Sequence, residues 1–259
     1  MDLGIAGRKA IVCASSRGLG KACARALAEA GCEVVMNGRG AATLEAAAAE
    51  IAKATGAKVS AVTADVATPE GQAALLAACP TPDILINNNG GPPFRDFREL
   101  TRQQMIDGVI ANMIVAVELI QKVIDPMTSR KFGRIVNITS SSVKMPLAGL
   151  DLSSGARAGL TAFLGGIART VASSNVTINN ILPGAFDTDR LRGGLGKTAE
   201  QKGVSVEEAA KARKAAIPAK RFGDPAEFGD ACAYLCSAQA GYITGQNLLI
   251  DGGTFNGAF

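Results

Sequence analysis

Short apolar runs alternate with longer stretches of helical character along the whole chain. The runs show little alternation between apolar and polar residues, which is typical of strands covered on both faces of a sheet. We predict strands at residues 10–13, 33–36, 59–62, 84–86, 134–138, 177–181 and 248–250, and a helix after each of the first six. This repetition predicts an α/β fold, a doubly wound sheet of seven parallel strands with helices on both faces.

Residues 187–221 interrupt this alternation with a connection far longer than is usual between a strand and a helix. Inside it, Gly193-Gly194-Leu195-Gly196 is typical of a hinge, and a helix is predicted to start at Val206. Basic residues outnumber acidic ones in this segment. We therefore predict one domain, 1–259, with a lid insertion at about 187–221 over a substrate pocket; a solvated surface insertion is the alternative.

The composition excludes several classes of function. The chain of 259 residues has no His and no Trp, which excludes a zinc site built on imidazole and a Ser-His-Asp triad, and we expect no bound metal. The net charge of +4 is spread along the chain, which argues against a nucleic-acid partner. We see neither a signal peptide nor an apolar run near the roughly 18 residues of a membrane span. The six Cys form no C-x-x-C pair, so we predict a cytoplasmic protein with buried thiols and no membrane partner.

A glycine-rich turn follows the first predicted strand and precedes an alanine-rich helix. In Rossmann-type folds, the backbone N–H groups of such a turn approach a pyrophosphate at the positive end of the next helix. The position between strand and helix makes the motif far more specific than a glycine-rich turn alone. We predict that a dinucleotide is bound here by Ser15, Ser16, Arg17, Gly18, Leu19 and Gly20.

Several further motifs follow this turn in a characteristic order. They are Asn87-Asn88-Asn89-Gly90, Pro183-Gly184 followed by Thr188, the stretch 242–246, and Asp251-Gly252-Gly253. With them, the chain resembles the short-chain dehydrogenase/reductase family, close to its β-ketoacyl-carrier-protein-reductase-like branch, over about residues 7–253. The resemblance implies more cofactor-binding residues: Asp65 and Val66 at the adenine, Asn88, Gly90, and Pro183, Gly184 and Thr188 near the nicotinamide carboxamide.

Ala14 departs from the family pattern, which usually has a glycine at this place in the first turn. If the φ angle of Ala14 is negative, its methyl group is tolerated. A positive φ would instead shift the turn and weaken the binding of a dinucleotide.

The charge after the second strand predicts which dinucleotide is bound. A carboxylate there would bind the ribose 2′-OH and repel a 2′-phosphate. The chain has Asn37-Gly38-Arg39 at this place, and Arg17 lies in the first turn. Two guanidinium groups can clamp a phosphate, so we expect NADP(H) rather than NAD(H); two solvated surface arginines are the alternative.

The resemblance also implies a catalytic site in which an Asn, a Ser, a Tyr and a Lys cooperate. In the family, the Tyr donates a proton to the carbonyl and the Lys lowers the pKa of that Tyr, while the Asn helps to hold a water and the Ser orients the substrate. Asn112 and Ser140 match the Asn and the Ser, but Ser153 and Arg157 stand where the Tyr and the Lys belong. We predict that all four are catalytic and that Arg157 also contacts the cofactor.

This exchange weakens proton donation. An aliphatic hydroxyl is a far weaker acid than a phenol, whose pKa is about 10, and arginine stays protonated. Losing general-acid help typically costs about 10²–10⁴-fold in rate. Lys144 or Asp151 are alternative proton donors, and Ser154 could replace Ser153. The loop 90–94 is predicted to be either a stiff wall near the nicotinamide or a rigid turn without function.

Three functions remain open. The favoured one is an atypical NADP(H)-dependent carbonyl reductase or alcohol dehydrogenase for a small compound, which would be anionic if Arg157 and the basic lid bind a carboxylate. The second is a non-redox, retro-aldolase-like lyase that uses Ser140, Ser153 and Arg157 as an oxyanion or carboxylate site. The third is a catalytically silent dinucleotide-binding protein. The resemblance implies a homo-oligomer, a tetramer or dimer, assembled through helices at about 102–127 and 153–172.

Overall fold

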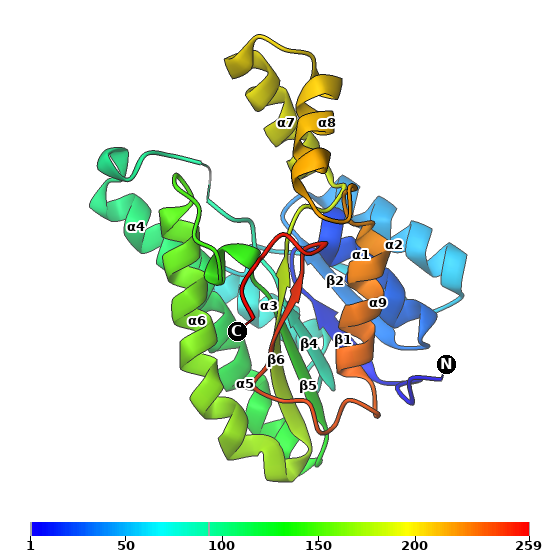
Figure 1. Cartoon of the computed structure of the whole chain (residues 1–259). Coiled ribbons are helices and arrows are strands. Elements are labelled where there is room, and N and C mark those ends of the chain that lie inside the picture. Colours follow the sequence, from blue (N-terminus) through cyan, green and yellow to red (C-terminus); the bar gives the residue numbers. More distant parts are fainter. Residues whose placement is uncertain (1, 93, 259) are drawn as a thin grey trace.

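The computed structural model of the chain describes residues 2–92 and 94–258. Its centre is a parallel sheet with the strand order β3-β2-β1-β4-β5-β6-β7 (Figure 1). The strands are β1 (Lys9–Val12), β2 (Glu33–Gly38), β3 (Val59–Thr63), β4 (Ile84–Asn87), β5 (Gly133–Ile138), β6 (Val176–Pro183) and β7 (Asn247–Ile250). All seven predicted strands are confirmed, with ends that differ by one or two residues.

Helices cover both faces of the sheet, as predicted (Figure 1). One apolar core joins the sheet to α1, α2 and α9, and a second joins it to α3, α5 and α6. The helices in the described residues are α1 (Gly18–Glu29), α2 (Ala41–Thr55), α3 (Pro69–Ala78), α4 (Arg102–Val109), α5 (Val115–Ser129), α6 (Asp151–Val171), α7 (Asp189–Lys202), α8 (Val206–Ala216) and α9 (Pro225–Cys236). Within this part of the chain, no helix combines the length and apolar character that crossing a membrane requires.

A pair of helices, α7 and α8, projects from the body at the end where β6 finishes (Figure 1). Leu195 and Ala199 of α7 pack against Ala209 of α8, and this small apolar cluster holds the two helices together. The hinge expected at residues 193–196 is wrong, because these glycines lie inside α7. The chain turns instead at Gly203, whose φ of 64° suits a glycine.

A row of asparagines crosses β4, β5, β6 and β7 at directly paired positions, from the last residue of β4 to the first residue of β7. Asn87 Nδ2 donates to Asn137 Oδ1 at 2.9 Å, Asn137 Nδ2 to Asn180 Oδ1 at 3.0 Å, and Asn180 Nδ2 to Asn247 Oδ1 at 2.8 Å. These bonds give each amide of the row a partner, and only the Asn87 Oδ1 end of the row lacks one in the described residues. We call this row the amide ladder.

Candidate active site

The first turn is fastened to β2 by Ser15, which is fully buried. Its hydroxyl donates to Val12 O at 2.8 Å, and its backbone N–H donates to Asn37 O at 2.8 Å. Asn37 N donates back to the Ser15 hydroxyl at 3.1 Å. Ser15 therefore shapes the turn, and its polar groups are already engaged within the protein, unlike those of a direct cofactor contact.

The close packing of the turn requires glycine at position 20. A Cβ on Gly20 would lie 2.4 Å from Ala14 O and 2.8 Å from Asn88 Nδ2. The Asn88 amide in turn donates to Ala14 O at 3.1 Å, which ties the end of β4 to the turn. Ala14 has a φ of 44°. Of the two backbone conformations considered for this alanine, the structure therefore shows the one with positive φ, which is unfavourable for a residue with a Cβ.

A cleft of about 310 Å³ opens beside this turn. Arg17 begins α1 without a side-chain cap, and α1 has no acidic residue in its first turn, so the positive end of the helix is available to an anion. Gly18 has a φ of 56°, and its missing side chain leaves the backbone open to close approach. Leu19 is half-buried against the core. The residues lining the cleft include Ser16, Arg17, Gly18, Lys21, Thr43, Glu50 and Asp189. This arrangement fits the pyrophosphate of a dinucleotide.

The predicted adenine end lies at the carboxyl ends of β2 and β3. Arg39 is exposed, and its Nη1 lies 3.8 Å from Asp65 Oδ2. Val66 is buried against the core. Arg39 follows β2 directly, and its exposed guanidinium is accessible to a ligand as well as to Asp65.

The residues predicted near the nicotinamide come from the end of β6. Gly184 N donates to Ile250 O at 2.8 Å, and a Cβ on Gly184 would lie 2.6 Å from Asp251 Cβ. Pro183 ends the strand, and Thr188 caps α7 by accepting from Leu191 N at 3.4 Å. The Thr188 methyl group lies 3.6 Å from the position of a Cβ on Gly18, so this segment meets the first turn.

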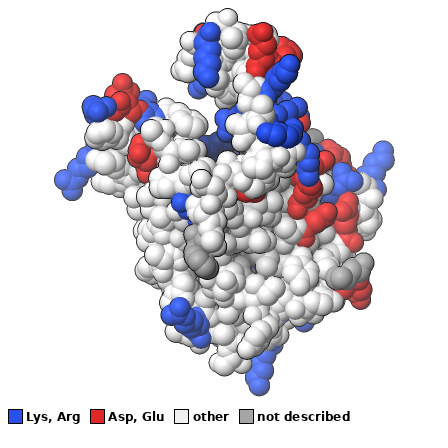
Figure 2. Space-filling model, viewed as in Figure 1, with Lys and Arg blue, Asp and Glu red and all other residues white. Residues whose placement is uncertain are grey.

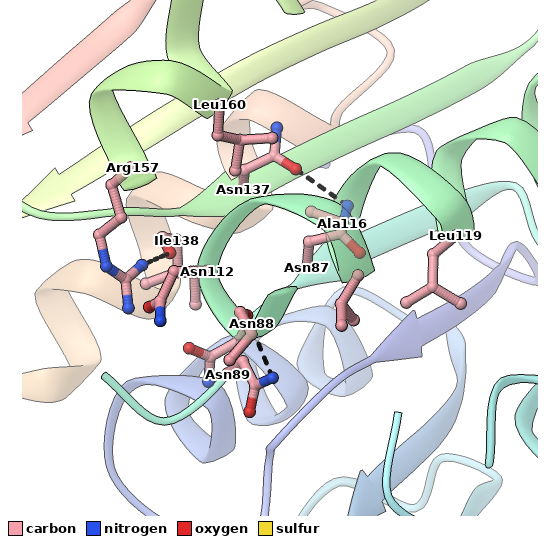
Figure 3. A pocket seen from close by; sticks show the side chains of 12 residues that line it. Asn87, Asn88, Asn89, Asn112, Ala116, Leu119, Asn137, Ile138, Arg157 and Leu160 are labelled. Carbon is pink, nitrogen blue, oxygen red and sulfur yellow. Dashed lines mark hydrogen bonds between the residues drawn. The ribbon is translucent and has the colours of Figure 1, made fainter. Parts of the chain in front are cut away.

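The altered catalytic positions lie one turn apart on α6, and both side chains are buried. Arg157 Nε donates to Ser153 Oγ at 3.2 Å. Arg157 Nη1 donates to Ile138 O at 2.7 Å (Figure 3). The Ser153 hydroxyl accepts a hydrogen bond and makes none as a donor within the described residues. Ser154, by contrast, donates to Leu150 O at 2.9 Å, so the alternative in which Ser154 replaces Ser153 is not supported.

Arg157 and Asn112 face one another across a small internal cavity of about 20 Å³ (Figure 3). Asn112 lies in a π-helical segment (Ile110–Ile114) between α4 and α5, and its Nδ2 donates to Gly108 O at 3.0 Å. The Oδ1 atoms of Asn112 and Asn87 are buried and lack a hydrogen-bond partner in the described residues. The cavity is large enough for one water, and π-helical turns are frequent at functional sites.

Burial of the guanidinium and, to a smaller extent, the nearby charge of Arg190 together lower the pKa of Arg157 to about 10. Arg157 has no ion-pair partner among residues 2–92 and 94–258. It still carries a charge at neutral pH, as expected from the sequence. Arg190 was not among the predicted site residues, although it lies in the basic segment predicted as a lid.

The other predicted groups make local contacts. Ser140 Oγ accepts from Ser142 N at 3.1 Å and keeps its hydroxyl proton free for another acceptor. Lys144 Nζ lies 5.6 Å from the centre of the Phe255 ring, and Asp151 accepts from Gly149 N at 3.0 Å. Gly90 is exposed and donates to Asn89 Oδ1 at 2.8 Å. In the loop 90–94, Pro93 lies outside the described residues.

The described residues contain no cluster of three His, Cys, Asp or Glu side chains suited to a metal ion.

Known proteins resemble this chain over almost its whole length. Residues 13–254 match the family model described as enoyl-(acyl carrier protein) reductase. The chain is 33% identical over 257 residues to the 3-oxoacyl-[acyl-carrier-protein] reductase FabG of Vibrio cholerae, covering 98% of this chain and 99% of the relative. It is 30% identical over 252 residues to the NADPH-dependent reductase BacG of Bacillus subtilis, covering 95% and 97%.

A solved structure shows the same architecture. L-sorbose reductase from Gluconobacter frateurii, solved with NADPH and L-sorbose, matches with a TM-score of 0.94 at 28% identity, over 99% of this chain and 100% of that one. The order of the motifs, the sheet and these relatives agree. This chain belongs to the short-chain dehydrogenase/reductase family, in its 3-oxoacyl-carrier-protein-reductase-like branch.

Proposed function

We propose that this protein is an NADP(H)-dependent carbonyl reductase or alcohol dehydrogenase whose usual proton-donor pair is replaced by Ser153 and Arg157. The observation that carries the proposal is the buried hydrogen bond from Arg157 Nε to Ser153 Oγ. It orients the serine hydroxyl and leaves its proton available to a substrate oxygen.

The cofactor is NADP(H), which supplies or accepts a hydride when it is bound. The names of BacG and of the L-sorbose reductase structure state NADPH for those proteins. In this chain, Arg39 and Arg17 would meet the 2′-phosphate, and the first turn would hold the pyrophosphate. The remaining contacts would come from Asp65, Val66, Asn88, Gly90, Arg157, Pro183, Gly184 and Thr188.

Two hydroxyls and a cation would stabilise the substrate oxygen during hydride transfer. Ser140 and Ser153 each keep a hydroxyl proton free, so both can donate to the oxygen as its negative charge develops. The Arg157 charge next to Ser153 strengthens that donation. A serine does not readily give up its proton, so the alkoxide is protonated from solvent. We expect a rate about 10²–10⁴-fold below that of a site with a tyrosine.

The wider features of the molecule are also proposals. The α7–α8 pair acts as the lid of the substrate pocket, because it begins directly after Thr188. The protein assembles into a dimer or tetramer through α5 and α6, where Phe163 is 48% exposed. Its place in the cell is the cytoplasm.

The test combines cofactor titration with a substrate screen. NADPH and NADH binding is followed by cofactor fluorescence, and ketones, aldehydes and hydroxy acids are screened by absorbance at the nicotinamide band. Turnover with cofactor oxidation is expected. Cleavage of a substrate without cofactor oxidation would identify a lyase, and tight NADPH binding without any reaction would identify a silent binding protein.

Matched variants locate the chemistry. Ser153→Ala is expected to lower kcat at least tenfold because it removes a donor to the reacting oxygen, while Ser154→Ala leaves kcat nearly unchanged, since that hydroxyl bonds Leu150 O. The double variant Ser153→Tyr, Arg157→Lys should raise the rate. If it reduces no carbonyl faster than the parent does, the pocket is not built for hydride transfer.

A further inference from the structure

Arg157 is a buried cation whose partners are all neutral. Its two hydrogen bonds go to a serine hydroxyl and a backbone carbonyl. The cavity beside it is lined by asparagines and apolar residues and by no carboxylate. An isolated charge removed from water is costly unless an opposite charge comes near it. The Arg157 guanidinium is therefore able to bind an anionic ligand, because no anionic side chain of the described residues pairs with it.

A second guanidinium approaches the same region from the lid. Arg190 lies in the first turn of α7, and its Nη2 donates to Pro92 O at 3.3 Å in the loop after β4. The same nitrogen lies 2.8 Å from the position that a Cβ on Gly91 would occupy. Glycine at 91 therefore leaves room for the Arg190 side chain. The two cations repel each other, which contributes to the lowered pKa of Arg157.

The acidic neighbours of Arg190 are bound to a different arginine. Asp187 Oδ1 lies 3.1 Å from Arg192 Nε, and Asp189 Oδ1 lies 3.4 Å from Arg192 Nη1. Arg190 has no ion pair in the part of the chain that the structure describes. Figure 2 shows basic side chains in the hollow between the projecting helices and the body. The opening of the pocket is therefore positive.

We propose that Arg157 and Arg190 together hold the carboxylate of an oxo-acid or hydroxy-acid substrate. The inference rests on the proposed reductase function and names its substrate class. The planar fork of each guanidinium matches a carboxylate, and two of them can share its oxygens. The substrate carbonyl then reaches the free hydroxyls of Ser140 and Ser153. Binding the anion also offsets the repulsion between the two cations, which draws α7 toward the body.

The test is a calorimetric titration with malonate and with malonamide, which has a similar shape and no charge, on the protein with and without NADP⁺. Malonate should bind and malonamide should not. Arg190→Gln should weaken malonate binding at least about tenfold, the usual effect of losing a charged hydrogen bond. Lys197→Gln removes the same charge from an exposed position of α7 and should change the affinity less than about twofold.

Four results would overturn the proposal. Equal binding of malonate and malonamide would mean that charge is not recognised, and equal losses in Arg190→Gln and Lys197→Gln would mean that only the general charge of α7 matters. If Arg190→Gln weakens NADP⁺ binding but spares malonate, the arginine serves the cofactor. Inorganic phosphate that binds tighter than malonate would assign the pair to a phosphoryl group instead. The titrations need no turnover, so they remain decisive even if no carbonyl is reduced.

Discussion

Ala14 adopts a backbone conformation that L-residues avoid. Its φ of 44° lies in the left-handed region, where a Cβ crowds the following carbonyl at a cost of roughly 1–2 kcal/mol. The conformation persists because Asn88 Nδ2 holds the Ala14 carbonyl and the turn is fastened to β2 through Ser15. Strain is therefore stored in the turn that we propose to hold the dinucleotide.

Ala14→Gly should relieve this strain. We expect the free energy of unfolding to rise by about 0.5–1 kcal/mol, because part of the gain is offset by the larger entropy of glycine in the unfolded chain. Urea denaturation measures the change, and NADPH affinity should increase in parallel. Ala46→Gly on the exposed face of α2 is the control and should destabilise by about 1 kcal/mol. A loss of stability in Ala14→Gly would show that the turn is not strained.

The lowered pKa of Arg157 predicts a pH dependence of anion binding. The folded protein binds this proton less tightly than the unfolded chain. Burial of the charge therefore costs stability below about pH 10, and this cost decreases as the pH rises above about 10. Malonate affinity should be constant from about pH 7 to 9 and fall about tenfold per unit above about pH 10. In Arg157→Gln, which keeps every lysine, the affinity should be low and nearly independent of pH.

At the scale of elements, α7 contains three glycines in a helix that would be more stable without them. A side chain added at Gly193, Gly194 or Gly196 would meet nothing within 4 Å. Glycine in a helix interior costs roughly 0.5–1 kcal/mol relative to alanine. The helix is held by its Thr188 cap and by the contact of Leu195 with α8, so it is expected to open locally more easily than the body.

Gly194→Ala should stiffen the lid. Hydrogen exchange of the α7 amides should slow by about threefold to fivefold, since stability rises by up to about 1 kcal/mol. If lid opening limits product release, kcat should fall while the affinity for NADPH stays constant. Gly166→Ala in α6 is a matched control, because that glycine is also exposed, helical and free of neighbours within 4 Å. Equal effects of both variants on kcat would argue against a lid.

The strands could be predicted because short, continuous apolar runs stand between helical stretches, and all seven are present. The helical conformation of residues 193–196 could not be predicted. The cap at Thr188 and the packing of Leu195 outweigh the low helix propensity of the three glycines. The π-helical turn at Asn112 has no local sequence signal, since it depends on how α4 and α5 join. Local sequence patterns thus predicted the strands. The features that were not predicted, the helix at residues 193–196 and the π-helical turn, depend on contacts between elements.

At the scale of the whole molecule, the predicted burial of the cysteines is confirmed for all six. Burial raises the pKa of Cys13 and of Cys32 to about 12, so neither forms the reactive thiolate at neutral pH. The thiols of Cys232 and Cys236 contact one another within the core between α1 and α9. The cysteines therefore act as small apolar residues of the interior.

A thiol reagent should accordingly label none of the six cysteines in the native protein within minutes at pH 8, and all six in guanidinium chloride. The slow rate at which the native protein is labelled should depend on the equilibrium constant for opening of the fold. NADPH should lower this labelling rate further, since ligand binding stabilises the folded state. Rapid labelling of even one cysteine would mean that a helix layer opens independently.

The site could be predicted only where it follows the chain order of motifs. Ser153 and Arg157 were found from their register on α6, and the structure brings them together. Arg190 and the position of Gly91 were missed because their proximity depends on long-range folding of the lid against another loop. The hydrogen bonds between Ser15 and Asn37 were missed for the same reason, since Asn37 lies on β2.

The amide ladder has an electrostatic direction. Each amide donates toward β7, so every side-chain oxygen points back toward β4, and aligned hydrogen bonds polarise one another. The negative end of this chain of dipoles is Asn87 Oδ1, which borders the cavity shared with Arg157. The ladder therefore places a partial negative charge at the edge of a cavity that Arg157 also lines, and no carboxylate among the lining residues balances the cation.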